Sequence, residues 1–334
     1  MSKIIYVTSP EMCQIHVFKI NSNGHLNLLQ VLNTKYEGNT IVLHPLKNYF
    51  YLGIKNNCGI INYKINKNGS LKEICITKLP GSPTFLFIDS FGKYLYIVSY
   101  DKGNLSLSNI NSQFIIEKPK QIINGLTGCH SINFDFINNK IWIPCLKKHL
   151  IKIFNIANNG ILSCLKNKNI YFEYNDGPRH ISFNKNKKYA YVINELSGTV
   201  STIYINIKKK NPFILNKINI INNKYIYYAW SSDIHITPNG KWLYCCDRNL
   251  NIVSVFSVSK KGNIIYYIGF IKTAIQPRSL IIDQNGKFII ISGQKSNNIF
   301  IYKINNTSGY LYKLNRYKVG LGTTWLSIKK MNKK

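Results

Sequence analysis

Four residues of types that bind anions or transfer protons occur in short turns, each directly before an apolar run. They are His130, Arg179, His180 and Arg278. The turns that carry them are residues 128–131, 177–180 and 276–279. A guanidinium group holds a phosphate or carboxylate through two parallel hydrogen bonds, and an imidazole exchanges protons near neutral pH. The recurrence of this junction suggests that repeated structural units bring these side chains to one place.

The chain contains a long-period repeat whose most regular position is an aromatic or large apolar residue. The marker residues are Tyr6, Tyr51, Tyr96, Trp142, Tyr191, Tyr244 and Ile290. Their successive spacings are 45, 45, 46, 49, 53 and 46 residues, which makes seven units. Each unit carries four short runs rich in β-branched and aromatic residues, separated by turns that contain Gly, Asn or Pro. This pattern, with little helical periodicity, is typical of the blades of a β-propeller.

The two ends of the chain match complementary parts of one unit. Residues 4–9 resemble the second strand of a blade and residues 324–328 resemble a first strand, which the alternative of two packed β-sandwiches would not explain. We therefore predict an all-β, seven-bladed β-propeller with four-stranded blades, in which the C-terminal strand completes the N-terminal blade and closes the ring. We expect one domain over residues 1–331 and a short basic tail at 332–334. The polar residues 208–224 coincide with the widest spacing and are expected to form a longer surface hairpin or loop between blades five and six.

Aligning the blades on the marker residues predicts which side chains share a face. The first strand of a blade lines the central channel and the second runs antiparallel to it, so the start of one and the end of the other open on the same face. The first of these positions contains Asn39, Thr84, His130, Arg179, Ser232, Arg278 and Thr324. The second contains Pro10, Lys55, Tyr100, Leu146, Glu195, Arg248 and Gln294. The channel mouth is therefore expected to be polar and cationic, with one carboxylate.

Some of these residues also have a purely structural interpretation. The alternative for Arg248 is an ion pair between blades with its neighbour Asp247. His180 and Asp233 lie one step further into the channel, and Asp233 is two residues from His235 on the same face of a strand. The alternative for Asp233 and His235 is a hydrogen-bonded pair that locks the strands. The titratable and cationic members of the first ring occupy equivalent positions in different blades, which favours a function for them.

The formal net charge of +31 would suit a protein that binds nucleic acid or an anionic membrane. Most of this charge is lysine, which occurs together with asparagine and isoleucine in every turn, and these three residues share codons rich in A and T. We interpret the excess as compositional bias and expect no specific nucleic acid, no membrane and no obligate protein as a partner. The N-terminal segment is too short for a signal peptide, and no stretch approaches the roughly 18 apolar residues of a membrane span. We therefore expect a cytoplasmic protein.

Signatures of metal or serine chemistry are missing from the sequence. There is no GxSxG, no HExxH and no cluster of acidic residues suited to a metal. The eight cysteines form no CxxC motif, and we expect them to be reduced. We predict neither a cofactor nor a metal. A mouth with arginines, an imidazole and one carboxylate can hold an anion, polarise a carbonyl and activate water, which points to hydrolysis of an acidic ester or lactone.

Seven short motifs, in their order and spacing, resemble those of the bacterial propeller-type 6-phosphogluconolactonases. They are residues 128–131, 177–180, 194–196, 233–238, 246–248, 276–278 and 293–296. The resemblance covers essentially the whole chain. It implies hydrolysis of a small phosphorylated sugar lactone, 6-phospho-D-glucono-1,5-lactone, to 6-phospho-D-gluconate in the pentose phosphate pathway, without a metal or organic cofactor. It also implies a set of site residues, namely His130, Arg179, Glu195 and Arg278.

The expected roles divide these residues between catalysis and binding. Either Glu195 or His130 activates water, and the sequence leaves this choice open. Arg179 is expected to stabilise the oxyanion, and Arg278 to hold the phosphate together with Arg248 or Lys55. The expected substrate-binding residues are Arg248, His180, Asp233, Gln294 and Lys55. The alternatives are an enzyme that forms or opens a carboxy-muconate lactone, as in fungal members of the same superfamily, and a non-catalytic propeller scaffold.

Overall fold

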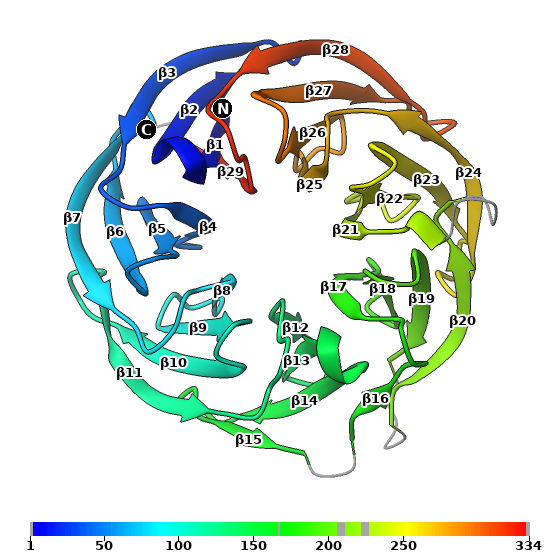
Figure 1. Cartoon of the computed structure of the whole chain (residues 1–334), viewed down its shortest axis with the longest axis horizontal. Helices are drawn as coiled ribbons and strands as arrows, with labels where there is room; N and C mark the ends of the chain where they lie inside the picture. The colour runs from blue at the N-terminus through cyan, green and yellow to red at the C-terminus, as the bar shows by residue number, and fades with distance from the viewer. Residues whose placement is uncertain (1–2, 166–167, 206–210, 222–226, 332–334) are drawn as a thin grey trace.

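Seven antiparallel sheets surround a central axis in the described part of the chain (Figure 1). The structure is a computed structural model, and it describes residues 3–165, 168–205, 211–221 and 227–331. Figure 1 looks down the shortest axis of the molecule, so the ring of blades is a flattened disc. The prediction of an all-β, seven-bladed propeller is confirmed.

Within each blade the strands follow one another outward from the axis. Blade 1 contains β29 (Trp325–Lys330), β1 (Lys3–Ser9), β2 (Gln14–Ile20) and β3 (Leu26–Asn33). Blades 2 and 3 contain β4 (Gly38–Leu43), β5 (Tyr49–Ile54), β6 (Gly59–Ile65), β7 (Leu71–Lys78), β8 (Phe85–Ile88), β9 (Tyr94–Ser99), β10 (Asn104–Ile110) and β11 (Ile116–Ile123). Blades 4 and 5 contain β12 (Asn133–Asp135), β13 (Lys140–Cys145), β14 (Leu150–Ile156), β15 (Leu162–Cys164), β16 (Ile170–Tyr171), β17 (Pro178–Phe183), β18 (Tyr189–Asn194), β19 (Thr199–Tyr204) and β20 (Phe213–Asn219). Blades 6 and 7 contain β21 (Ser231–Ile236), β22 (Trp242–Asp247), β23 (Ile252–Val258), β24 (Ile265–Lys272), β25 (Pro277–Ile282), β26 (Phe288–Gly293), β27 (Asn298–Ile304) and β28 (Leu311–Lys318).

The last strand of the chain completes the first blade, as predicted. Strand β29 pairs antiparallel with β1 over all of its own length, from Thr8 opposite Trp325 to Lys3 opposite Lys330. This pairing closes the ring and places β1 inside its sheet, between β29 and β2. The expected basic tail at 332–334 lies outside the described residues.

Two details of the outer strands differ from the prediction. In blade 4 the outer position is shared by β15 and β16, which both pair with β14, so this sheet has five strands. The interpretation of residues 208–224 as a hairpin or loop is wrong for Phe213–Asn219, which forms β20 and pairs with β19. Most side chains of β20 are exposed, while Ile214 and Ile218 pack partly against the core. The strand therefore lacks the regular alternation of a half-buried strand. The flanking parts, 208–210 and 222–224, lie outside the described residues.

The marker tyrosines repeat because each one links its blade to the next. Their side chains are buried, and their hydroxyl groups donate to backbone carbonyls in the outer turn of the following blade. The pairs are Tyr6 with Gly69, Tyr51 with Phe114, Tyr96 with Gly160, Tyr191 with Gly262, and Tyr244 with Gly309. A buried tyrosine stabilises the fold when its ring is packed and its hydroxyl finds a partner.

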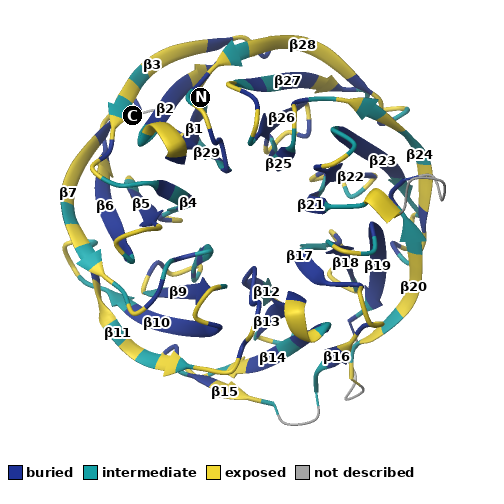
Figure 2. Ribbon diagram, in the orientation of Figure 1, coloured by how far each residue is buried: buried dark blue, intermediate teal, exposed yellow. Residues whose placement is uncertain are grey.

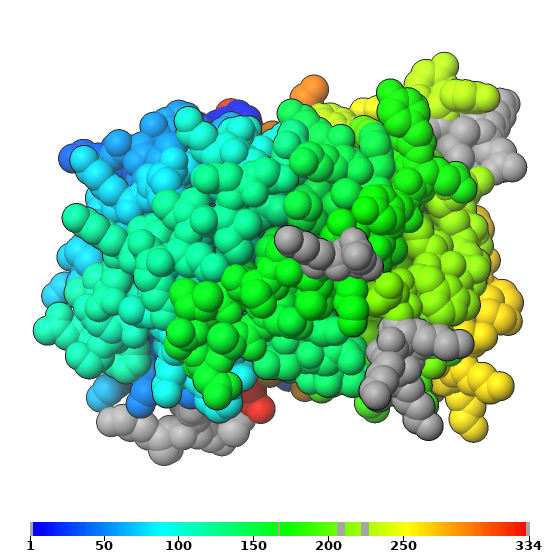
Figure 3. Space-filling model, turned by 90° about the horizontal axis from the view of Figure 1, so that it is seen from below, coloured from blue at the N-terminus to red at the C-terminus, as the bar shows by residue number. Residues whose placement is uncertain are grey.

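The burial of a strand depends on its position in the blade. Figure 2 shows that the inner strands are mostly buried and that the outermost strands are largely exposed. In Figure 3 the blades form a continuous outer wall on the side shown, from blade 3 in cyan to blade 6 in yellow-green. The first strands all begin at the same end of the axis, so the polar side chains at their starts lie together there, inside a ring of packed apolar blades.

Candidate active site

β-Bulges place Arg179 and Arg278 at the mouth of the channel. The register of β17 against β18 shifts between Pro178 and His180, so Arg179 has no partner on β18. The register of β25 against β26 shifts in the same way at Arg278. A bulge adds a residue to one strand and changes the direction of its side chain. Both guanidinium groups accordingly line the channel rather than continue the alternation of the strand.

Glu195, which follows the end of β18, is the centre of a buried ion cluster. Its Oε2 lies 2.8 Å from Nε of Arg179 and 2.9 Å from Nη2 of Arg248. Its Oε1 accepts a hydrogen bond of 3.1 Å from Nε1 of Trp230. The side chains of Arg179 and Arg248 are only 2% and 3% exposed, so both cations depend on this one carboxylate as a counter-charge.

Arg278 adds a third guanidinium group beside this cluster. Its Nη1 donates a hydrogen bond of 3.0 Å to Oε1 of Gln294, and no carboxylate in the described part of the chain forms a salt bridge with it. Burial and repulsion by Arg179 lower the pKa of Arg278 to about 10 and that of Arg248 to about 9. Burial acts to raise the pKa of Glu195, but Arg179 and Arg248 outweigh it and hold the pKa below its ordinary value. Three guanidinium groups thus lie around the carboxylate of Glu195, which suits an anionic ligand. The prediction of a mouth with one carboxylate is wrong, because Glu11, Glu37 and Asp101 also line it.

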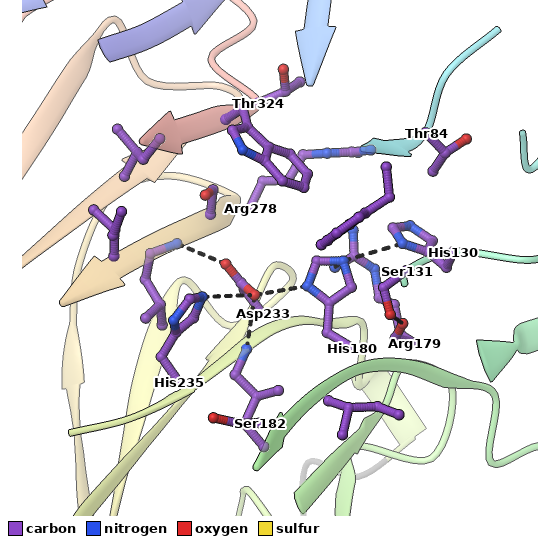
Figure 4. Close-up of a pocket in the computed structure, with 18 of the residues that line it drawn as sticks. Thr84, His130, Ser131, Arg179, His180, Ser182, Asp233, His235, Arg278 and Thr324 are labelled. Atoms are coloured by element: carbon purple, nitrogen blue, oxygen red, sulfur yellow. Dashed lines mark hydrogen bonds and ion pairs between the residues drawn. The ribbon is translucent and has the colours of Figure 1, made fainter. Parts of the chain in front are cut away.

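His130, His180 and Asp233 form a row that leads into the channel (Figure 4). Nδ1 of His180 lies 2.8 Å from Oδ1 of Asp233, and Nε2 of His180 lies 3.2 Å from Nδ1 of His130. Burial and the nearby Arg179 hold the pKa of His130 well below its usual value. Burial and Arg179 also lower the pKa of His180 to about 4, although Asp233 acts against them. Both imidazoles are therefore neutral at neutral pH.

Two cavities meet at this row, and five residues line both. The shared residues are Asn39, Thr84, His130, Arg278 and Thr324. The mouth cavity, of about 350 Å³, is also lined by Lys55, Glu195, Arg248 and Gln294. The channel cavity, of about 220 Å³ and drawn in Figure 4, is also lined by Arg179, His180 and Asp233. All nine predicted site residues thus lie around one continuous region at one end of the axis.

Comparison with known proteins places this arrangement in a family. Residues 4–327 match the family described as lactonase, 7-bladed beta-propeller. The chain belongs to this lactonase family. It is 42% identical over 328 residues to a 6-phosphogluconolactonase of Sodalis glossinidius (strain morsitans), covering 98% of this chain and 99% of that protein. It is 43% identical over 335 residues to a 6-phosphogluconolactonase of Blochmanniella pennsylvanica (strain BPEN), covering 99% of each.

Solved structures show the same fold at lower identity. A crystal structure of a protein from Lactobacillus plantarum superimposes on this lactonase-family chain with a TM-score of 0.90. The two chains are 20% identical, and the match covers 99% of this chain and 100% of the other. Their likeness therefore concerns the propeller itself.

Not every residue of the two predicted rings reaches a cavity of this lactonase propeller. Ser232 is fully buried, and its Oγ donates to the carbonyl of Pro277. Leu146 lines neither the mouth cavity nor the channel cavity. Arg248 pairs with Glu195, and among the described residues no salt bridge joins it to Asp247, although the alternative interpretation required one. Since Glu195 lies in the neighbouring blade, this contact could not be read from adjacency in the sequence.

Trp230 is the site residue that the sequence analysis missed. Its indole nitrogen binds Glu195, and its ring lies under the guanidinium carbon of Arg248, 3.8 Å from the ring centroid. A cation over an indole ring is attracted by the negative face of the ring, so Trp230 holds both partners of the ion pair. The available signal was its position two residues before the ring member Ser232.

The sequence also led us to expect no metal site, reduced cysteines and no membrane-spanning segment. In the part of the chain that the structure describes, no group of three or more His, Cys, Asp or Glu side chains is placed to hold a metal ion. All eight cysteines are free. Among the same residues, no helix has the length and apolar character needed to cross a membrane.

Proposed function

We propose that this protein hydrolyses 6-phospho-D-glucono-1,5-lactone to 6-phospho-D-gluconate, the activity named for its full-length relatives. The observation that carries the proposal is the cluster of three guanidinium groups at the inner part of the mouth. Arg179 and Arg248 pair with Glu195, and Arg278 has no salt bridge among the described residues. The other carboxylates of the mouth cavity are half-buried or exposed, namely Glu11, Glu37 and Asp101. A phosphate dianion bound beside these groups would relieve the repulsion between the guanidinium groups. The mouth cavity of about 350 Å³ lies within the usual range of small-molecule sites, roughly 300–1,000 Å³.

Arg278 is the best candidate for the main phosphate ligand. A guanidinium group has five N–H donors. Arg179 pairs with Glu195 and donates to the carbonyl of Ser232. Arg248 pairs with Glu195 and donates to the carbonyls of Trp230 and Ser231. Arg278 makes one hydrogen bond within the described residues, to Gln294, and lines both cavities. Lys55 is exposed on the mouth cavity and would add a second cation.

His130 is a better candidate for the base than Glu195. The two oxygens of Glu195 already face Trp230, Arg179 and Arg248. The neutral imidazole of His130, by contrast, lies where the two cavities meet. A positioned base accelerates such a reaction by roughly 10² to 10⁴. The charge of the buried Arg179 would stabilise the negative oxygen that develops on the lactone carbonyl.

The wider biological setting stays a prediction from the sequence. A cytoplasmic protein that acts in the pentose phosphate pathway without a cofactor would meet its substrate as a free small molecule. The expectation that neither nucleic acid, a membrane nor an obligate protein partner is required also stays a prediction.

Acid release from freshly generated phospholactone, measured above the spontaneous rate, tests the proposal. The wild type should accelerate the release, and His130→Gln should lose about 10²-fold or more in kcat. The matched control is Arg316→Gln, because Arg316 is exposed on β28, away from the site. No acceleration by the wild type would overturn the proposed activity, and turnover of a carboxy-muconate lactone in its place would favour the alternative reaction.

A further inference from the structure

The protonation of the row Asp233, His180 and His130 can be assigned from its neighbours. Oδ1 of Asp233 accepts a hydrogen bond of 3.0 Å from the backbone N–H of Ile234. Its Oδ2 accepts one of 3.0 Å from the N–H of Leu280. Backbone donors on both oxygens favour the ionised form. Burial acts to raise the pKa of Asp233, but His235 and His180 outweigh it and hold the pKa well below its usual value, so Asp233 is a carboxylate.

His180 is held in one tautomer by its contacts on both ring nitrogens. Nη1 of Arg179 lies 3.2 Å from Nε2 of His180, and a guanidinium group can only donate. The Nε2 atom must therefore carry a lone pair. The proton of the neutral ring then lies on Nδ1, which is 2.8 Å from the carboxylate of Asp233.

This assignment determines the tautomer of His130 in turn. Nδ1 of His130 lies 3.2 Å from Nε2 of His180, whose single lone pair it shares with Nη1 of Arg179 as a second donor. The contact is favourable only when Nδ1 of His130 carries a proton, since two facing lone pairs repel. A neutral imidazole has a single N–H, so Nε2 of His130 keeps its lone pair. Among the described residues, none forms a hydrogen bond with this atom, and the ring of His130 lines both cavities.

We propose that Asp233 and His180 are positioning residues that hold His130 in the Nδ1–H tautomer and so make its Nε2 the base of the reaction. This inference rests on the proposed function. The oxygen of a water molecule bonds to the lactone carbonyl carbon while one water proton moves to Nε2. The bond from that carbon to the ring oxygen then breaks, and the proton on Nε2 passes to the ring oxygen, which becomes the product hydroxyl group.

The groups around His130 favour the neutral form that this role requires. They are Arg179 and His180 from β17, Arg248 after β22, Arg278 from β25 and Tyr100 after β9. Burial and these cations keep the pKa of His130 well below its usual value. Its lone pair is therefore available throughout the neutral range.

Nitrogen NMR of histidine-labelled protein tests the tautomers without an activity assay. The chain contains seven histidines, and the spectra of His130→Gln and His180→Gln assign the two signals that matter. At neutral pH we expect both rings to be neutral, with His130 and His180 each protonated on Nδ1 and not on Nε2. A wild-type His130 that is protonated on Nε2 would overturn the inference.

Kinetics of variants test whether the row acts on the reaction. His180→Gln keeps one donor and one acceptor and should retain most of kcat, whereas His180→Phe keeps the bulk of the ring and removes both. We expect His180→Phe and Asp233→Asn to lower kcat about 10- to 100-fold with little change in KM, because the whole contribution of a base is roughly 10² to 10⁴. The control is His25→Gln, since His25 is exposed in the turn between β2 and β3, at the rim of the ring. His235 does not serve as a control, because its Nε2 lies 3.5 Å from Oδ1 of Asp233.

The outcomes separate this inference from the proposed function. Wild-type kcat in both His180→Phe and Asp233→Asn would refute the positioning role, even with lactonase activity present. A wild-type protein without lactonase activity would overturn the proposed function and, with it, the catalytic role of the row. The NMR spectra would still decide the tautomer assignment by themselves.

Discussion

Replacing Arg278 by Gln tests whether the mouth of the channel binds the phosphate group. Of the five donors of this guanidinium group, one is directed to Gln294, which leaves a pair for two phosphate oxygens. A hydrogen bond to a charged group contributes about 1.5–3 kcal/mol, and about 1.4 kcal/mol is tenfold in affinity. Because Lys55 lines the same cavity and retains part of the charge, we expect KM for the phospholactone to rise about 10- to 100-fold.

The assay compares this substrate with the unphosphorylated glucono-1,5-lactone, measured as acid release above the spontaneous rate. For Arg278→Gln the KM of the unphosphorylated lactone should not change, because the lost contact is with phosphate. Arg316→Gln should leave both values at those of the wild type. Equal losses for the two lactones would refute the phosphate role of Arg278 and place it at the reacting carbonyl group.

Three further predictions concern stability. Glu195→Gln removes the counter-charge of two buried arginines and should lower the free energy of unfolding by about 3–5 kcal/mol. Inorganic phosphate should restore part of this loss, measured by thermal unfolding. A variant as stable as the wild type would contradict the ion cluster. The pKa of His180 is lowered from 6.5 to about 4, so the unfolded state binds more protons between these values, and up to about 3 kcal/mol of stability present above pH 6.5 should be lost as the pH falls towards 4. Denaturant unfolding at pH 7 and pH 5 measures this loss, and the loss should be smaller in His180→Phe. A wild-type protein that is equally stable at the two pH values would disprove the prediction. Tyr96→Phe leaves the carbonyl of Gly160 without its donor and should lower the free energy of unfolding by about 1–3 kcal/mol, measured by denaturant unfolding. An unchanged free energy would show that the hydroxyl does not link the blades.

The fold was predictable from the sequence because its repeat has a physical cause. A tyrosine such as Tyr96 must lie on the inner second strand to reach the outer turn of the next blade, so the spacing of these residues measures the size of a blade. The closing strand was predictable because the two ends matched different strands of one blade. Strand β20 was not predictable in the same way. Most of its side chains are exposed, and the two that pack against the core, Ile214 and Ile218, are too few to produce a clear alternating pattern.

The location of the site could be predicted, but its internal contacts could not. Register alone places Arg179, Arg278 and Glu195 at one face, since it depends only on counting residues along strands. The ion pair of Glu195 with Arg248 depends on the packing of one blade against its neighbour, which no local pattern records. The same holds for the ring of Trp230 under Arg248. The sequence placed His180 one step further into the channel than Arg179 and assigned it to substrate binding. Its ring nitrogens both have protein neighbours, which favours a contact that orients His130.

The distribution of arginine supports the site independently of any register. The chain contains 44 basic residues, of which only four are arginine: Arg179, Arg248, Arg278 and Arg316. Three of these four meet at the channel mouth, while the abundant lysines are spread through the turns of every blade. A buried lysine readily loses its proton, whereas guanidinium remains charged and presents its donors in a planar fork. Where a cation is buried and must bind carboxylate and phosphate, arginine is therefore required, and the surface lysines of a basic chain cannot replace it.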